Sequence, residues 1–402
     1  MNYINKLYHS IAFSIVVLYC SYAYLYIFNS GLTGFKPLYW YFLTIGAAVG
    51  YVISKRSLSI TLTSPVILIW LWLYIGNTII CFLYSRQGVV ETQALIDNIE
   101  MMMLFYSFII IFQIDGAVKT VRVALLVVVL FSVVMNFIDL FYASMSAVPG
   151  RAAGLYQNPN AAGLNMIMAM LVSVSLIPRR LRLVFCLIIG AGIFITFSRG
   201  AWLSWVIALT GLSVIGYLDM GRKGFSVILI STVAAFIVFS ALTGGLIDVL
   251  TLLGFDTYLR PGTLARLGGD GSAFADYSYT SRVRAAESAL SVFADKPWFG
   301  DGLAVDKHWE VGAHNTYLRL AAEGGIIRLS LFIMLIVLLW NITDSVGKVI
   351  LIIYALTGFT SHDHLRQPSL LIILSLLVVV SKNSNKISNP DPSYYETGKS
   401  YS

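Results

Sequence analysis

Residues 120–143 read TVRVALLVVVLFSVVMNFIDLFYA, an almost unbroken run of apolar side chains. A helix needs about 20 such residues to cross the ~30 Å hydrocarbon core of a bilayer. The run is continuous and lacks the alternation of apolar and polar residues that a strand of a membrane β-barrel requires. It therefore predicts a transmembrane α-helix.

The same pattern recurs along the chain. Of its 402 residues 58% are hydrophobic and 12% are charged, whereas soluble domains carry about 25% charged residues. About twelve apolar segments approach the length of a membrane helix. They lie at 9–28, 37–54, 64–84, 94–113, 120–143, 161–177, 181–197, 200–217, 224–246, 325–341, 346–360 and 368–381. The sequence thus predicts an all-α integral membrane protein, and the first segment, which no small-residue cleavage site follows, is predicted to be a retained anchor.

The distribution of Lys and Arg predicts the orientation of these helices. Basic residues are concentrated in alternate short loops, for example at Lys55, Arg56, Arg179 and Arg180, and such loops face the cytoplasm. Both termini are therefore predicted to be cytoplasmic. The predicted divisions are transmembrane helices 1–9 (1–246), an outer loop domain (247–313), a re-entry helix with transmembrane helices 10–12 (314–381), and a disordered cytoplasmic tail (382–402).

Composition also excludes several classes of site. The net charge of +7 is explained by the basic loops and requires no nucleic-acid partner. Cys20, Cys81 and Cys186 lie far apart in apolar segments, which predicts free thiols rather than disulfides or metal ligands. The sequence has no zinc spacing, P-loop or nucleophile elbow, so we predict no metal and no cofactor.

The outer loop ends in a segment, YTSRVRAAESALSVFADKPWFG (279–300), that predicts a short amphipathic helix at the membrane surface. Thr280 or Ser281 would cap it, and Pro297 with Gly300 would end it. Its predicted apolar face consists of Val283, Ala286, Leu290 and Phe293. Arg282 and Arg284 would then occupy the first turn, where backbone N–H groups and guanidinium groups favour an anion such as phosphate. The alternative is that both point into solvent or toward lipid headgroups.

Two further residues interrupt apolar runs on the outer side. Arg199, in FITFSRGAWLSW (194–205), either binds an anion or anchors the interface beside the neighbouring tryptophans. His314, in GAHNTYLRLAAEGG (312–325), can exchange a proton near neutral pH. It could instead be a hydrogen-bond partner, although Asn315 or Thr316 could cap the following helix and leave it free.

Four acidic residues in apolar surroundings complete the set. Glu323 lies four residues after Arg319, which predicts a structural ion pair. Asp97, Glu100 and Asp139 lie near the outer ends of their segments. They either line a water-filled cavity or lie at the interface.

The outer-face motifs together resemble the O-antigen ligase and polymerase superfamily. In chain order they are GLYQNPNAAG (154–163), SRGAWL (198–203), SRVRAAESALSVFADKPWFGDGL (281–303) and HNTYLRLAAEGGIIRL (314–329). The position of Pro297 places Arg282, rather than Arg284, on the arginine of that family. Ala286 replaces a frequent aromatic residue, and a pair of glycines, Gly324 and Gly325, replaces a single one.

The resemblance implies a fold like that of the membrane glycosyltransferase C enzymes, in the bacterial inner membrane, with one long periplasmic loop that carries short helices. It implies a glycosyltransferase that takes a glycan from undecaprenyl pyrophosphate without a metal. A ligase passes the glycan to the lipid A core oligosaccharide, a polymerase passes it to another lipid-linked repeat, and a third group passes it to a protein serine. The single long loop favours the ligase. A lipid-linked saccharide transporter, from a different class, is disfavoured because the charges cluster at one face.

Residue roles follow from the resemblance and from the chemistry of the donor. Arg199 and Arg282 are predicted to bind the pyrophosphate, which carries negative charge as it leaves. His314 is predicted to take the proton of the acceptor hydroxyl, or to orient the acceptor. Asn158, Asn160, Arg284 and Asn315 are possible substrate-binding or structural residues, and Asn158 and Asn160 could simply shape a turn. The expected partners are the lipid-linked donor, the lipid A core acceptor and membrane lipids.

Overall fold

The computed structural model describes residues 3–54, 65–141, 145–148, 151–219, 272–309, 312–361 and 364–388. Its longer helices are α1 (Tyr3–Cys20), α2 (Ala23–Asn29), α3 (Pro37–Ser54), α4 (Pro65–Tyr84), α5 (Val89–Phe112), α6 (Ala117–Phe141), α7 (Pro159–Ser173), α8 (Arg182–Phe194), α9 (Arg199–Val214), α13 (Ser272–Asp295), α14 (Thr316–Ile342), α15 (Ser345–Thr357) and α16 (Pro368–Ser388). Short 3₁₀ helices are η1 (Gly154–Tyr156), η2 (Val174–Leu176), η3 (Arg179–Leu181), η4 (Val305–His308) and η5 (His364–Arg366). The described residues contain helices and no strand, as predicted.

Within these ranges six helices are long and apolar enough to cross a membrane. They are α3, α4, α5, α6, α7 continued through η2 to Leu176, and α14. The pair α1 and α2, bent by 57°, makes a seventh if it is counted as one span. Eleven of the predicted apolar segments coincide with helices, although α8, α9 and α15 are shorter than a full crossing. The segment at 224–246 lies outside the described residues, so a total of about twelve spans stays a prediction.

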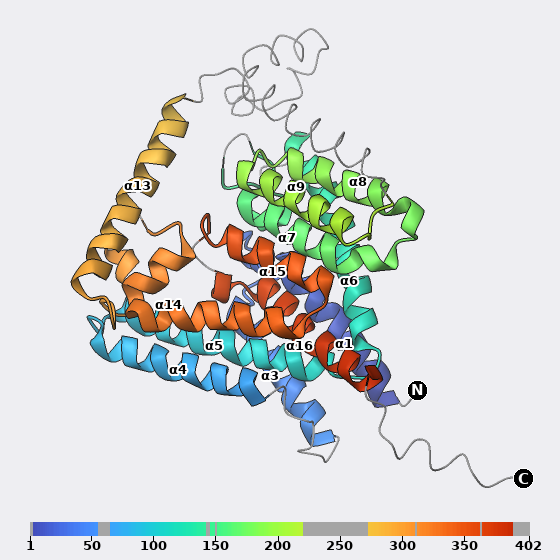
Figure 1. Ribbon diagram of the computed structural model, residues 1–402, viewed down its shortest axis with the longest axis horizontal. Helices are drawn as coiled ribbons and strands as arrows, with labels where there is room; N and C mark the ends of the chain where they lie inside the picture. The colour runs from blue at the N-terminus through green and yellow to red at the C-terminus, as the bar shows by residue number, and fades with distance from the viewer. Residues whose placement is uncertain are drawn as a thin grey trace, which may run out of the picture.

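The packing places the last described helix at the centre of the bundle (Figure 1). Every residue of α16 from Pro368 to Val379 is buried, as expected for a helix that is apolar all round. It contacts α1, α5, α7 and α14, which come from widely separated parts of the chain. α4, α5 and α14 lie side by side along one flank, and α6 to α9 form a second group.

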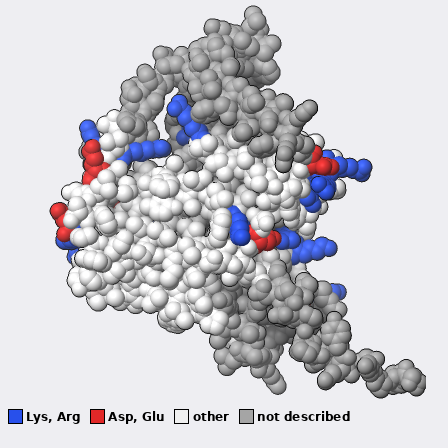
Figure 2. All heavy atoms as spheres, in the orientation of Figure 1, with Lys and Arg blue, Asp and Glu red and all other residues white. Residues whose placement is uncertain are grey.

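The surface supports membrane insertion of this bundle. Figure 2 shows most charged side chains of one face near two opposite ends, with a broad uncharged band between them over α4, α5 and α14. Large apolar side chains are exposed on these helices, including Ile69, Trp72, Leu83, Ile333 and Val337. An exposed apolar belt of this kind is expected where lipid tails, rather than water, surround a protein.

The predicted re-entry helix and tenth span form one helix, α14, which is broken internally. Gly324 and Gly325 have non-helical backbone angles, and Gly325 has φ 62° and ψ −157°, a region that only glycine adopts readily. The break exposes backbone groups to the segment after α13: Ile326 N–H donates to Pro297 O at 2.7 Å, and Asp301 N–H donates to Ala322 O at 2.8 Å. The glycine pair therefore allows this segment to dock into α14.

The loop helix differs from its prediction. α13 begins at Ser272, so the expectation that Thr280 or Ser281 caps it is wrong. Arg282 and Arg284 consequently lie in the body of α13, and its N-terminal N–H groups cannot explain them. The face of α13 that packs on the bundle is formed by buried Ala285 and Ala289, while Leu290 of the predicted apolar face is 52% exposed. The contact of that predicted face with the membrane surface stays a prediction. The predicted end is confirmed, since α13 stops at Asp295, just before Pro297.

Gly325→Ala should destabilise the protein strongly. The added Cβ would lie 2.3 Å from the Trp298 carbonyl carbon, at a backbone conformation that alanine resists. We expect a loss of roughly 2 kcal/mol or more, measured as a lower apparent Tm in detergent. Gly46→Ala is the matched control, because a Cβ at this position of α3 meets nothing within 4 Å. Equal Tm values for the two variants would contradict the role assigned to the break.

Candidate functional site

The Asn-Pro-Asn element forms the start of α7. Asn158 is the N-cap, and its Oδ1 accepts hydrogen bonds from Asn160 N–H at 2.9 Å and Ala161 N–H at 3.3 Å. Pro159 occupies the first helical position, where its missing N–H costs nothing. In this structure Asn158 therefore shapes the helix start, the simpler of its two predicted roles.

Asn160 joins this element to the Ser-Arg-Gly break. Its Oδ1 accepts hydrogen bonds from Ser198 Oγ at 2.8 Å and from Arg151 Nη2 at 2.9 Å. Ser198 also caps α9, because its Oγ accepts a hydrogen bond from Ala201 N–H. A Cβ on Gly163 would lie 2.3 Å from Ala201 Cβ, so α7 and α9 approach closely near their N-termini. Two motifs that are separate in the sequence thus form one rigid unit.

Arg199 is the first residue of α9 and its side chain is exposed. Among the described residues it makes no hydrogen bond or ion pair. The free N–H groups at the start of α9 lie beside its guanidinium, and both attract anions. The position of Arg199 is therefore compatible with the predicted anion-binding role.

His314 lies directly before α14 and is also exposed. Asn315 is the N-cap of α14, since its Oδ1 accepts a hydrogen bond from Leu318 N–H at 3.1 Å. It is one of the two residues predicted to cap this helix. Thr316 anchors the turn to residues 358–361: its N–H donates to Gly358 O at 2.8 Å and its Oγ1 to Ser361 O at 2.6 Å. Asn315 thus caps the helix, and the imidazole of His314 lies at the surface.

The segment 358–361 brings the Arg199 and His314 regions together. Thr316 is bonded to it, and a Cβ on Gly200 would lie 3.7 Å from Thr360 Oγ1. A buried histidine, His364, supports the same turn, with Nδ1 3.3 Å from Thr316 Oγ1 and Nε2 2.9 Å from Thr357 Oγ1. The sequence did not predict a role for His364, because its partners, Thr316 and Thr357, are not its neighbours in the sequence.

Arg282 lies on the exposed face of α13, away from contact with Arg199 or His314. It makes no hydrogen bond or ion pair within the described ranges. α13 packs on α14 and η4 through Ala289, which clusters with Val305 and Ala322. Figure 2 shows Lys and Arg side chains beside the hollow that separates α13 from the rest of the bundle. Exposed Val283 and Leu290 lie on the same helix as Arg282, so α13 presents both charged and apolar groups.

The sequence comparison agrees with this arrangement of motifs. Residues 183–333 match the family model described as O-antigen ligase. The match supports the resemblance of the outer-face motifs to the O-antigen ligase and polymerase superfamily. The matched segment contains Arg199, Arg282 and His314, while Asn158 and Asn160 precede it. No curated protein matches the chain.

The candidate site rests on a buried network of charges. Glu323, which is fully buried, forms ion pairs with Arg328 at 3.3 Å and Arg366 at 3.4 Å. Arg319, also buried, interacts electrostatically with the same carboxylate. This supports the structural role predicted for Arg319 and Glu323. Arg328 and Arg366 were not predicted, although arginines at the edges of apolar segments are a recognisable signal.

The network ties several helices to the site. Arg328 donates hydrogen bonds to side chains of α4 and α5, which are Tyr74, Asn77, Thr78 and Asn98. Glu323 Oε1 accepts a hydrogen bond from Ala304 N–H at 3.3 Å, just before η4. His308 of η4 lies 2.6 Å from Glu91 Oε1 of α5. The loop that follows α13 is therefore fixed to α14 and α5.

Of the three membrane carboxylates left open by the sequence, Asp139 has a defined role. It is fully buried and accepts hydrogen bonds from Met145 N–H and Ala153 N–H at 2.8 Å and Gly154 N–H at 3.1 Å. It therefore holds the approach to the Asn-Pro-Asn element. Asp97 accepts a hydrogen bond from Gln93 at 2.7 Å and, like Glu100, is half-buried.

Metal binding finds no support in the described ranges, where no three His, Cys, Asp or Glu side chains are grouped together. Metal independence remains a prediction of the resemblance. Cys20, Cys81 and Cys186 are free and buried, as predicted.

Asp306 of η4 is an unusual member of the network. It is 2% exposed, and its Oδ1 has no hydrogen-bond partner among the described residues. Burial, with the nearby negative charge of Glu323, raises the pKa of Asp306, against the opposing effect of Arg319, Lys307 and Arg366. The folded protein thus holds a proton on Asp306 more tightly than the unfolded chain does.

Stability should therefore fall as pH rises from about 3.9, the ordinary Asp pKa, through the raised pKa of the folded state. Asp306→Asn removes this titration, so the Tm of the variant relative to wild type should increase across that window. Thermal unfolding of both proteins from about pH 4 to about pH 8 measures this difference in Tm, because that range begins near the ordinary pKa of a carboxyl group. Asp295→Asn, at an exposed carboxylate, should show no such increase. A difference that is constant with pH would contradict the assignment.

Proposed function

We propose that this chain is an O-antigen ligase. In this proposal it transfers the O-antigen glycan from undecaprenyl pyrophosphate to the lipid A core oligosaccharide on the periplasmic side of the inner membrane, in lipopolysaccharide biosynthesis. The observation that carries the proposal is the meeting of the Arg199 and His314 regions at residues 358–361. Both Arg199 and His314 lie in the segment that matches the O-antigen ligase family model.

The donor has two chemical parts that these residues suit. Its pyrophosphate accumulates negative charge as the glycosyl bond breaks, and the guanidinium groups of Arg199 and Arg282 would neutralise it. Its polyprenyl chain is apolar, and Val283 and Leu290 expose apolar surface on the helix that carries Arg282. Exposed Trp298 and Phe299 follow on the next turn of chain, which suits a position at the membrane interface.

The reaction would be a direct displacement. The acceptor hydroxyl oxygen attacks the anomeric carbon, its proton passes to the His314 imidazole, and undecaprenyl pyrophosphate leaves with the electrons of the broken carbon–oxygen bond. Attack opposite the leaving group inverts the anomeric carbon. Arg284 and Asn160 would act nearby, Asn160 by fixing the Ser-Arg-Gly break through its bond to Ser198.

The polymerase reaction is the principal alternative, since both classes share the donor chemistry. Transfer to a protein serine is a third possibility with the same donor. A transporter of lipid-linked saccharides is the alternative from another class. The prediction of one long outer loop at 247–313 favours the ligase, and the acceptor decides among the transferases.

His314→Ala should abolish transfer without abolishing donor binding. Loss of a general base typically reduces the rate about 10²- to 10⁴-fold. The assay uses purified protein with EDTA, an undecaprenyl-pyrophosphate glycan, and either lipid A core or a second lipid-linked repeat as acceptor. His308→Ala is the control, because that histidine pairs with Glu91 of α5.

Glycosylated lipid A core in the presence of EDTA supports the ligase. Elongated lipid-linked glycan as the sole product identifies a polymerase instead. Donor binding with no transfer to either acceptor would contradict both, and would favour the protein-acceptor or transporter alternative.

Arg199→Ala and Arg282→Ala should each reduce transfer by roughly 10²-fold or more, as expected when a charge-stabilising donor is lost. The Lys variants should recover only part of the rate, because an ammonium cannot make two parallel hydrogen bonds to a phosphate. Lys296→Ala is the control, since this exposed cation near α13 is paired with Asp301. A single turnover with radiolabelled donor measures the effect, and full activity of either alanine variant would remove that arginine from the proposal.

A further inference from the structure

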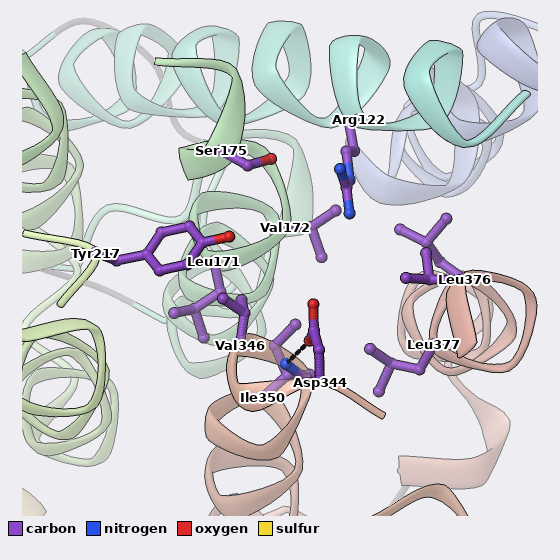
Figure 3. Close-up of a pocket in the computed structure, with 12 residues that line it drawn as sticks. Arg122, Leu171, Val172, Ser175, Tyr217, Asp344, Val346, Ile350, Leu376 and Leu377 are labelled. Atoms are coloured by element: carbon purple, nitrogen blue, oxygen red, sulfur yellow. Dashed lines mark hydrogen bonds between the residues drawn. The ribbon is translucent and has the colours of Figure 1, made fainter. Parts of the chain in front are cut away.

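A small pocket lies at the opposite end of the bundle from the candidate site. It is formed where α6 and α15 begin and where α7 and α9 end, beside the middle of α16 (Figure 3). Its polar lining residues are Arg122, Ser175, Tyr217 and Asp344, and its walls include Leu171, Val172, Ile350, Leu376 and Leu377. Its free volume of about 30 Å³ is that of two or three water molecules, enough for a compact polar group.

Two polar atoms of this pocket are unsatisfied. Arg122 Nε and Ser175 Oγ are buried without a hydrogen-bond partner in the part of the chain that the structure describes. Buried polar atoms are almost always bonded, so a missing ligand or ordered solvent is expected at both. Figure 3 shows Ser175 beside Arg122 and Tyr217 across the pocket, with its hydroxyl directed toward the space between them.

Two opposite charges face each other across the space. Arg122 extends from α6 and Asp344 from the start of α15 (Figure 3), but they form no ion pair among the described residues. The Asp344 carboxylate accepts one hydrogen bond, from Gly347 N–H at 2.8 Å. A ligand that fits between them must present a negative group to Arg122 and a positive group to Asp344.

The pocket is preformed. Asp344 is held in place because it caps α15. Tyr217 is held by Arg182, whose Nη1 donates to the Tyr217 carbonyl at 3.1 Å and whose guanidinium lies 4.8 Å from the ring centre. Since both walls are fixed before binding, a ligand loses little free energy in ordering them.

We propose that this pocket binds the zwitterionic headgroup of a phospholipid with a primary ammonium, such as phosphatidylethanolamine. Its phosphate bonds to Arg122 and Ser175, its ammonium donates to Asp344, and its acyl chains follow the apolar wall out of the pocket. The glycerol headgroup of phosphatidylglycerol has no positive charge to pair with Asp344. A choline headgroup has no N–H to donate to the carboxylate. The pocket lies at the ends of membrane helices, where headgroups are found.

The test is native mass spectrometry of the full chain in detergent, titrated with phosphatidylethanolamine, phosphatidylcholine or phosphatidylglycerol. Wild type should bind phosphatidylethanolamine most tightly. Arg122→Gln and Asp344→Asn should each weaken that binding roughly tenfold, as expected for one charge-assisted hydrogen bond. Asparagine caps a helix as well as aspartate does, so the Asp344 variant keeps the N-cap and loses only the charge.

Arg179→Gln is the matched control, because Arg179 lies at the same end of the bundle but is 63% exposed and pairs with Asp219. It should bind as wild type does. Because native spectra count lipids on folded protein alone, partial unfolding of a variant does not obscure the result. Equal binding of the three lipids by wild type, or an unchanged preference in both pocket variants, would overturn the proposal and indicate that only solvent occupies the site.

Discussion

The fold depends on one buried carboxylate. Glu323 has no exposed surface, and a charge in that position is stable only when it is paired and hydrogen-bonded. Arg328, Arg366 and the Ala304 N–H supply those bonds. They come from α14, η5 and the approach to η4, so a single side chain fixes three separate segments. Removing it would leave arginines buried without a counter-charge, a much larger cost than losing one surface ion pair.

The neighbouring break in α14 makes this network possible. Gly324 and Gly325 interrupt the helix one residue after Glu323, and the freed backbone groups receive the Pro297–Asp301 segment. That segment carries α13 and therefore Arg282. The other end of α14 carries His314, whose neighbours Asn315 and Thr316 fix the turn. Thus α14 links His314, the predicted base, to α13, which carries Arg282. Residues 358–361 link the His314 region to the Arg199 region.

Local sequence signals predicted local structure well. The apolar segments gave most helix positions, Asn315 was one of two predicted caps, and Pro297 predicted the end of α13 within two residues. These features depend on neighbours in the sequence. The start of α13 was mispredicted because Thr280 and Ser281 have the chemistry of caps, while the true beginning at Ser272 precedes a polar stretch with little apolar periodicity.

Features that depend on distant residues could not be predicted in this way. Arg319 and Glu323 are four residues apart, so their association was visible, but Arg366 and the partners of Arg328 on α4 and α5 are remote in sequence. The face of α13 that packs on the bundle was not predicted, for a related reason. Small Ala285 and Ala289 pack against the bundle, and larger Val283 and Leu290 stay exposed, as is reasonable where the surroundings are lipid and size, rather than polarity, decides the contact.

The central claim is that Arg199, Arg282 and His314 act on one lipid pyrophosphate, although the two arginines make no contact in the structure. The most direct measurement is an electron cryo-microscopy structure of the chain with bound undecaprenyl pyrophosphate. The account predicts both guanidinium groups at about 2.7–2.9 Å from pyrophosphate oxygens, with the His314 imidazole facing the glycan side of the leaving group. A pyrophosphate bound elsewhere, with Arg199 and Arg282 both in solvent, would contradict it.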